Sequence, residues 1–198
     1  MENTTAFTVQ TSTLDQMTEQ DRNGMFRLRH ETFVNRLGWD VETHDGMERD
    51  RFDQPGTHYI FLPGEHGSVD ACWRLLPTTG PYMLKDTFPE LLAGEPAPQA
   101  PDVWEMSRFA VATDRVGSTG QEFGPLSVEL MAESARFALE NGISRYVTVT
   151  TAAIERLLRK QGLSMHRLCA PLRIGRVLTV ACVIEVNATT LAAVGMVA

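Results

Sequence analysis

Polar and aromatic side chains interrupt several apolar segments of this sequence, and their types suit the binding of a charged ligand. Two aspartates flank Phe52, an arginine stands inside the run ACWRLL, and VWEMSRFAV carries both an acid and a base. Arginines and carboxylates can bind a zwitterion, whereas aromatic faces suit a purine or a sulfonium cation. The same residues could instead form a structural ion-pair network. The candidates are Arg29, Phe33, Trp39, Asp50, Asp53, Arg74, Glu105, Ser107 and Arg108.

The segment VWEMSRFAV, residues 103–111, has the β-branched and aromatic character of a buried strand. A charged side chain in such a strand is costly unless it is paired or hydrogen-bonded. In a regular strand Glu105, Ser107 and Phe109 face one side and Arg108 faces the other. If both charged residues serve one cleft, the strand must be irregular near Ser107, because bulges re-aim side chains beside active sites.

The hydrophobic pattern of the chain alternates strands and helices. It predicts strands over 6–10, 58–62, 68–76, 103–111, 145–150 and 176–186. It predicts helices over 14–37, 125–141 and 152–161, and a short helix over DTFPELL, residues 86–92. Residues 38–56 lack periodicity and predict a loop, and residues 115–124 predict a Gly-rich loop. This order favours an α/β domain built on one mixed sheet with helices packed on it.

Composition narrows the class of protein. A chain of 198 residues with 43% hydrophobic and 22% charged residues predicts one globular domain, and no apolar run is long enough to cross a bilayer. The net charge of −7 disfavours nucleic acid as the main partner. The three scattered cysteines form no CxxC pair, and MENTTAFTVQ does not resemble a secretion signal. We therefore expect a cytoplasmic protein that acts without a membrane.

Common catalytic and metal-binding motifs are absent from the sequence. It contains no GxSxG, HExxH or P-loop pattern, and its five histidines are dispersed, so no metal site is predicted. Small acetyl-CoA-type acyltransferases carry a (Q/R)xxGxG/A loop that holds a pyrophosphate on backbone N–H groups. The corresponding segment here, DRVGSTGQEFG, gives only RxGxxG from Arg115, Gly117 and Gly120. A divergent acyltransferase of that type is the alternative enzyme hypothesis.

Positive charge gathers in one segment of this acidic chain. Residues 145–176 contain seven basic residues and one acid, which gives that segment a charge of +6 and the remainder −13. A basic patch of this kind indicates an acidic partner, although a solvated helix face explains it equally well.

Four blocks of the sequence together resemble the signature of the acyl-homoserine-lactone synthases, the LuxI-type autoinducer synthases. The blocks are RLRHETFVNRLGWDV, ERDRFD, CWRLLPTTGPYMLKDTFPELL and VWEMSRFAV, and the resemblance runs from about Phe26 to Leu191. It implies an acetyltransferase-like (GNAT-type) three-layer α/β sandwich, with a mixed central sheet, helices on both faces and a cleft between splayed strands. It also implies one domain over 1–198, with a mobile S-adenosylmethionine-binding region at about 1–56 and an acyl- and carrier-binding half at about 103–198.

The resemblance further implies substrates and roles. These enzymes take S-adenosylmethionine, as a substrate and not a cofactor, and an acyl thioester, usually on acyl carrier protein, with acyl-CoA as a possible donor. Glu105 becomes the candidate general base, with Arg108 and Ser107 in the catalytic group. Asp50 and Asp53 are expected to pair with Arg29 or Arg74. The expected substrate-binding residues are Arg29, Phe33, Trp39, Asp50, Asp53, Arg74 and Phe88.

Acyl-chain and docking residues are expected in the second half of the chain. Arg156 and Lys160, at i and i+4 on one helix, match family positions that carry cations and are candidates for docking the acidic carrier protein. A threonine in TVTT, Thr148 or Thr150, matches a position associated with 3-oxo acyl chains. Candidate acyl-chain residues are Met106, Leu126, Leu130, Met131, Thr148, Val149, Thr150 and Leu157. A non-enzymatic module that binds carrier protein or senses a ligand on the same fold is the third hypothesis.

Overall fold

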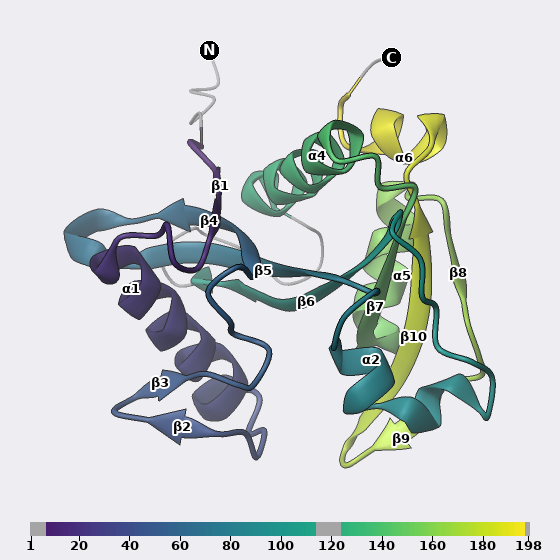
Figure 1. Cartoon of the computed structure of the whole chain (residues 1–198), viewed down its shortest axis with the longest axis horizontal. Coiled ribbons are helices and arrows are strands. Elements are labelled where there is room, and N and C mark those ends of the chain that lie inside the picture. The colour runs from purple at the N-terminus through teal and green to yellow at the C-terminus, as the bar shows by residue number, and fades with distance from the viewer. Residues whose placement is uncertain (1–6, 114–123, 197–198) are drawn as a thin grey trace.

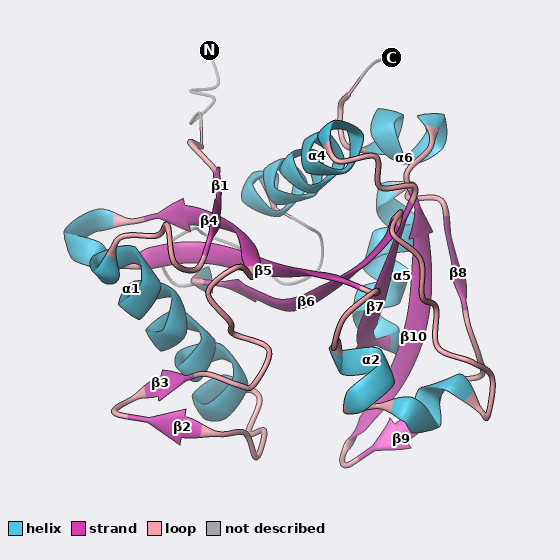
Figure 2. Cartoon of the chain, in the orientation of Figure 1, coloured by secondary structure: helices cyan, strands magenta, loops and turns pink. Residues whose placement is uncertain are grey.

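The computed structural model describes residues 7–113 and 124–196, and its centre is a mixed sheet (Figures 1 and 2). The strand order is β1-β4-β5-β6-β7-β10-β8, and β9 also pairs with β10. Within the described residues, β6 and β7 are the one parallel pair, and the other neighbouring strands are antiparallel. The strands are β1 (Gln10–Thr13), β4 (His58–Pro63), β5 (Val69–Pro77), β6 (Val103–Val111), β7 (Arg145–Thr151), β8 (Met165–Arg167), β9 (Leu172–Ile174) and β10 (Val177–Glu185).

The predicted strands over 58–62, 68–76, 103–111, 145–150 and 176–186 are confirmed to within one residue at each end. The prediction of a strand over 6–10 is wrong, because β1 begins at Gln10 and ends at Thr13. Its position follows from pairing with β4, which aligns Gln10 with Phe61 and Thr13 with His58. An edge strand of four residues depends on its partner more than on its own sequence pattern.

Helices cover both faces of the sheet (Figure 1). Helices α1 and α2 lie on one face, and α4, α5 and α6 lie on the other. The predicted three-layer α/β sandwich is therefore confirmed. The helices are α1 (Glu19–His30), α2 (Met83–Asp86), α4 (Pro125–Glu140), α5 (Ala152–Gln161) and α6 (Ala188–Ala193), together with a π-helical segment at Glu31–Arg36 and 3-10 turns at Glu65–Gly67 and Pro89–Leu92.

Two helix predictions need correction. The helix predicted over 14–37 begins only at Glu19, because the Thr18 hydroxyl accepts a hydrogen bond from the Asp21 N–H and caps the helix there. The helix predicted over DTFPELL is instead two short turns, Met83–Asp86 and Pro89–Leu92. Pro89 disfavours a helical conformation in the residue before it, and Phe88 has a φ of −125° and a ψ of 42°, outside the helical region. The helices predicted over 125–141 and 152–161 are confirmed.

The segment 38–56, predicted as a loop, contains a small hairpin of β2 (Thr43–His44) and β3 (Met47–Glu48). Asp45 and Gly46 form its turn with φ of 49° and 72°. Both central residues of a type I′ turn need positive φ, and Asp-Gly is a favoured sequence for it. The hairpin lies below α1 in Figure 1 and places Glu48 at the end of β3.

Three apolar clusters surround the sheet. The largest lies under α4 and α5 and includes Trp73, Met106 and Leu130. On the other face, one cluster packs α1 against β4 and β5, and a second packs α2 against β6, β7 and β10. On β5, Cys72 belongs to the first of these two clusters, Leu76 belongs to the second, and Arg74 lies between them. In the described part of the chain, no helix has the length and apolarity needed to cross a membrane.

Candidate functional site

The centre of the candidate site is an irregularity in β6. Pairing with β5 aligns Cys72 with Ala110 but Arg74 with Ser107, so Arg108 and Phe109 together oppose Trp73. Two residues opposite one is the definition of a β-bulge. Arg108 has a φ of 57°, which is uncommon for a residue with a side chain. The predicted irregularity near Ser107 is confirmed.

The bulge turns Arg108 to the face of the sheet that also carries Glu105 and Ser107. Arg108 donates from Nε to Glu48 at 3.1 Å and its Nη2 lies 2.8 Å from Asp50 Oδ2. The Ser107 hydroxyl accepts from Arg74 Nε at 3.1 Å. Strand β6 thus places the carboxyl of Glu105, the hydroxyl of Ser107 and the guanidinium of Arg108 on one face of the sheet.

Beside this bulge, arginines from α1, β5 and β6 meet the carboxylates of segment 48–53. Arg29 donates hydrogen bonds from both terminal nitrogens to the two carboxylate oxygens of Asp53, at 2.8 and 2.9 Å. Arg74 reaches Asp50 at 2.6 and 3.0 Å and Asp53 at 2.7 Å. The predicted pairing of the aspartates with these two arginines is confirmed. We call this group the ion cluster; its members are Arg29, Arg74, Arg108, Glu48, Asp50 and Asp53.

Three residues near the site were missed by the sequence analysis. Glu48 is fully buried and contacts both Arg29 and Arg108. The buried Tyr59 donates its hydroxyl proton to Asp53. Met83 places its sulfur 3.1 Å from Arg74 Nη2 and 3.3 Å from Arg108 Nη1. A signal for Glu48 was present, since it is the first residue of the block ERDRFD.

Mutual pairing compensates for the burial of the ion cluster. Burial by itself disfavours a charged Asp53, but Arg29 and Arg74 outweigh it and hold the pKa of that carboxyl well below its usual range. Burial likewise opposes the charge on Arg29, yet Asp53 and Glu48 raise its pKa. For Arg108 burial dominates and lowers the pKa, although Glu48 acts against it. Three positive and three negative side chains leave the cluster balanced.

Glu105 lies apart from the ion cluster, on the same face of β6. Its Oε2 accepts the Met83 N–H at 2.9 Å and its Oε1 accepts the Leu84 N–H at 2.7 Å, at the start of α2. Burial raises the pKa of Glu105 to about 7, although these two hydrogen bonds and the nearby arginines lower it. A carboxyl with a pKa near neutrality is suited to proton transfer.

Two of the three aromatic residues expected to bind substrate lie side by side. Phe33 and Trp39 stack with centroids 5.0 Å apart, and the Arg108 guanidinium lies 5.3 Å from the Phe33 ring centroid. Phe88 does not join them, because it packs on the cluster beneath α2 with neighbours such as Tyr82. The structure therefore brings together all the predicted polar residues and two of the three predicted aromatic side chains.

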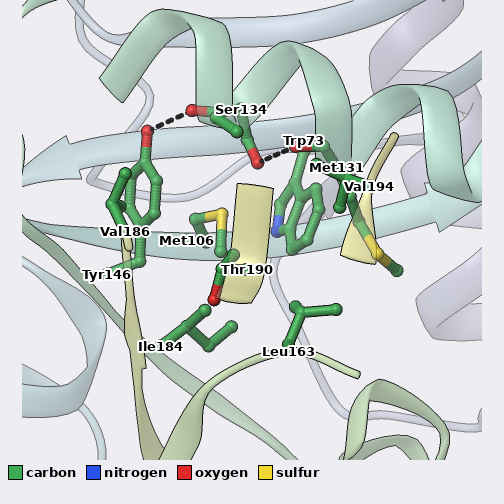
Figure 3. A pocket seen from close by; sticks show the side chains of 11 residues that line it. Trp73, Met106, Met131, Ser134, Tyr146, Leu163, Ile184, Val186, Thr190 and Val194 are labelled. Carbon is green, nitrogen blue, oxygen red and sulfur yellow. Dashed lines mark hydrogen bonds between the residues drawn. The ribbon is translucent and has the colours of Figure 1, made fainter. Parts of the chain in front are cut away.

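A small apolar pocket with a volume of about 20 Å³ lies on the other face of the sheet (Figure 3). The Tyr146 hydroxyl donates to the Ser134 carbonyl and the Ser134 hydroxyl to the Met131 carbonyl, each at 2.8 Å. Because the hydroxyl protons of Tyr146 and Ser134 are both used in these hydrogen bonds, the surface of the pocket is mainly hydrocarbon. It is lined by Trp73, Met106, Met131, Ser134, Ala135, Tyr146, Leu163, Ile184, Val186, Thr190 and Val194.

The predicted acyl-chain residues lie in different places. Met106 and Met131 line the pocket, and Leu126 and Leu130 are buried in the same cluster. Side chains alternate along a strand, so Thr148 and Thr150 share the side of the pocket residue Tyr146. The remaining two predicted residues lie elsewhere: Val149 packs on the cluster beneath α2, and Leu157 is half-buried.

Strands β6 and β7 pair over only part of their length. Their parallel ladder runs from Val103 and Arg145 to Met106 and Thr148, and then ends. Beyond it β6 continues beside β5, and β7 continues beside β10 (Figure 2). Glu105 on one face and Met106 at the pocket on the other are thus consecutive residues at the point where the sheet opens.

The predicted docking residues, Arg156 and Lys160, are exposed on α5. The neighbouring Arg159 and Arg167 instead bind Glu155, which is 1% exposed and accepts from Arg167 with both oxygens. Two of the seven basic residues of segment 145–176 therefore belong to an ion network with Glu155, and the other five, Arg156 and Lys160 among them, are exposed. The Gly-rich loop predicted over 115–124 lies, except for Gly124, outside the described residues.

Comparison with known proteins identifies the family. The profile of the family described as autoinducer synthase matches residues 13–194. The chain belongs to the autoinducer synthase family. An acyl-homoserine-lactone synthase from Pseudomonas aeruginosa is 44% identical over 168 residues, which is 84% of this chain and 83% of the relative. The synthase described here is accordingly an acyltransferase that makes an acyl-homoserine lactone.

Solved structures agree with this assignment. The crystal structure of the synthase LasI matches with a TM-score of 0.88 and 41% identity, over 98% of this chain and 97% of that one. BjaI, described as a CoA-dependent acyl-homoserine lactone synthase with SAM and isopentyl-CoA, matches with a TM-score of 0.84 and 28% identity, over 96% and 88%. An N-acetyltransferase from Lactobacillus plantarum, 15% identical over 92% and 99% with a TM-score of 0.64, shares the fold of the synthase.

Proposed function

We propose that this synthase acylates the amine of S-adenosylmethionine with an acyl thioester and then closes the product to the lactone. The observation that carries the proposal is the buried Glu105, whose pKa of about 7 lets it hold or release a proton near neutral pH. BjaI, which shares the fold over most of its length, is described with SAM and a CoA thioester.

The first proposed step forms the amide. The substrate ammonium gives a proton to the Glu105 carboxylate, directly or through a water, and the free amine attacks the thioester carbonyl. The carbon–sulfur bond breaks, and the thiolate takes the proton held by Glu105. The nitrogen, now bonded to the carbonyl carbon, gives its second proton to the freed Glu105 carboxylate, which passes it to water. In the second step the methionine carboxylate attacks the γ-carbon, which breaks its bond to the sulfonium sulfur and releases methylthioadenosine. A sulfonium and a thioester are already activated, so no further cofactor is proposed.

The ion cluster is proposed to bind S-adenosylmethionine through its two partly exposed members. Arg29, Arg74, Glu48 and Asp53 are fully buried, whereas the Asp50 and Arg108 side chains are 15% and 7% exposed. The two exposed members can contact a ligand, while the buried ones hold them in place. Phe33 and Trp39, stacked beside Arg108, supply an aromatic surface for the sulfonium or the adenine.

The acyl tail is proposed to occupy the pocket of Figure 3. Glu105 and Met106 are consecutive where β6 and β7 separate, so a tail attached to a thioester carbonyl beside Glu105 would pass between the two strands to the other face. The pocket, at about 20 Å³, must widen as the tail enters. Because the hydroxyl protons of Ser134 and Tyr146 bind carbonyls, the pocket favours an unsubstituted hydrocarbon end. That Thr148 or Thr150 recognises a 3-oxo group of the acyl chain stays a prediction.

Acyl carrier protein is the proposed acyl donor. Arg156 and Lys160 are exposed on α5, which suits docking of an acidic protein. An acyl-CoA donor, as in the description of BjaI, is the alternative. Since both acyl donors and S-adenosylmethionine occur in the cytoplasm, we propose that the synthase acts there.

The proposal is tested by incubating the purified protein with S-adenosylmethionine and a panel of acyl thioesters on carrier protein and on CoA. Mass spectrometry should detect an acyl-homoserine lactone and methylthioadenosine in equal amounts. Formation of the amide without methylthioadenosine would limit the enzyme to acylation. The absence of any lactone with every donor would contradict the proposal.

A further inference from the structure

Glu48 is a buried carboxylate that links three separate elements. It lies at the end of β3, accepts from Arg29 Nε on α1 at 2.5 Å, and approaches Arg108 Nη2 and Nε on β6 at 2.9 and 3.1 Å. Resting on the function proposed above, we propose that Glu48 is a positioning residue for acyl transfer, because it holds Arg108 in the conformation that the site requires.

Arg108 needs such an anchor because its backbone is in an unfavourable region. Residues with a Cβ rarely adopt a φ of 57°, and a conformation of this kind persists only where the surroundings enforce it. Glu48 and Asp50 bind the guanidinium from one side, and the ring of Phe33 lies 5.3 Å from it. These contacts keep the bulge in place, and the bulge sets the positions of Ser107 and Glu105 before it in the strand.

Glu48 cannot be replaced by its neighbours in the ion cluster. Asp53 is engaged by Arg29 and Arg74, and Asp50 is shared between Arg74 and Arg108. Loss of the Glu48 charge would leave three guanidinium groups facing two carboxylates. Asp50 would then be the only carboxylate of the cluster in contact with Arg108. The Asp50 side chain is 15% exposed, whereas that of Glu48 is fully buried.

The decisive experiment compares Glu48→Gln with the wild type and combines it with Arg108→Lys. Glutamine keeps the shape of the side chain and removes its charge. We expect kcat per folded protein to fall on the order of 10- to 100-fold in Glu48→Gln, because small displacements of reacting groups cost this much, while KM for the thioester stays within about twofold. The double variant should be no slower than Arg108→Lys alone, since Glu48 acts through Arg108.

The matched control is Glu133→Gln on α4. Glu133 also accepts two hydrogen bonds, from the Thr11 hydroxyl at 2.8 Å and Arg136 Nε at 2.7 Å, but it belongs to α4, on the other face of the sheet from the ion cluster. Its kcat should stay within about twofold of the wild type. If Glu48→Gln does not fold, Glu48→Asp keeps the charge on a shorter side chain and should fold with a kcat below that of the wild type.

Hydrogen exchange separates this inference from the proposed function. In Glu48→Gln the amides of Arg108 and Phe109 should exchange faster, while those of β10 keep their wild-type rates. If the wild type makes no lactone, the proposed function fails but this measurement still tests the anchoring. The inference is overturned by unchanged exchange at the bulge, by a kcat within twofold of the wild type, or by multiplying effects in the double variant.

Discussion

At the scale of single residues, burial and hydrogen bonding act in opposite directions on the pKa of Glu105. Glu105 is fully buried, yet both of its oxygens accept backbone N–H groups that stabilise the ionised form. Burial is the stronger influence and raises the pKa to about 7 from an ordinary 4.5. The carboxyl is therefore close to half-protonated at neutral pH, and a general base needs a pKa of this kind.

Replacing Glu105 by Gln should lower kcat by about 100-fold or more, the usual contribution of a general base. In the wild type kcat/KM should rise with pH up to about 7, as Glu105 becomes ionised, and this limb should be missing in Glu105→Gln. Initial rates of lactone formation between pH 5 and 8 measure both effects. A variant that retains the wild-type rate and pH profile would make Glu105 a structural residue.

The same pKa predicts an effect on stability with a definite sign. Because folding raises the pKa of Glu105 from 4.5 to about 7, the folded state binds the proton more tightly. Its stabilising contribution is complete below pH 4.5 and is lost as the pH rises through about 7. Urea denaturation should show that Glu105→Gln gains stability relative to the wild type between pH 5 and 8. A constant difference would contradict the raised pKa.

Asp53→Asn should destabilise the fold by about 3–5 kcal/mol, because it leaves Arg29 and Arg74 buried with too few carboxylates. Asp40→Asn, at an exposed position, should change the free energy of unfolding by no more than about 0.5 kcal/mol. Folding lowers the pKa of Asp53, so its contribution is present at neutral pH and is lost as the pH falls below its ordinary value of 3.8. Equal stability of the two variants in urea would refute the structural role of the cluster.

At the scale of elements, α1 positions Arg29 and approaches the β4–β5 connection closely. A Cβ built on Gly24 would lie 2.4 Å from the carbonyl oxygen of Gly67, which is backbone and cannot move aside easily. Only glycine fits there, so the helix is held near the sheet with Arg29 directed at the ion cluster.

Gly24→Ala should therefore destabilise the protein by about 1–3 kcal/mol, the usual cost of overpacking, even though alanine favours helix. Gly56→Ala is the control, because a Cβ at Gly56 meets nothing within 4 Å. Thermal or urea unfolding of the two variants measures the difference. Stabilisation by Gly24→Ala would mean that helix propensity outweighs the contact.

Elements with a strong periodic pattern could be predicted from the sequence, and those set by distant contacts could not. The long strands and helices α4 and α5 have the predicted bounds to within one or two residues. The position of β1 depends on β4, and Glu48 acquires its role only when β3 meets α1 and β6. The bulge was predictable because Glu105 and Arg108 have the wrong spacing to share one face of a regular strand.

At the scale of the whole molecule, charge is separated along the chain. The ion cluster is neutral and buried, whereas the exposed Arg156 and Lys160 lie on α5, in the basic segment. Such a separation suits an enzyme that handles a zwitterion at one place and docks an acidic protein at another.

Reversing Arg156 and Lys160 to glutamate should raise KM for acyl carrier protein by about tenfold, and the effect should shrink as salt is added. KM for S-adenosylmethionine should change less than about twofold, because α5 is on the other face of the sheet from the ion cluster. Steady-state kinetics at low and high salt measure both constants. An unchanged KM for the carrier protein would place docking elsewhere.

The sheet itself divides the proposed reaction between its two faces. The ion cluster and the Phe33–Trp39 pair lie on the α1–α2 face, and the apolar pocket lies beneath α4, while Glu105 and Met106 mark the opening between them. The most direct test is a crystal structure with methylthioadenosine and an acyl-homoserine lactone bound. We predict the adenosine beside Arg108 and Trp39, and the acyl tail between Met106 and Met131. Both ligands on one face of the sheet, or a tail outside the pocket, would contradict this account.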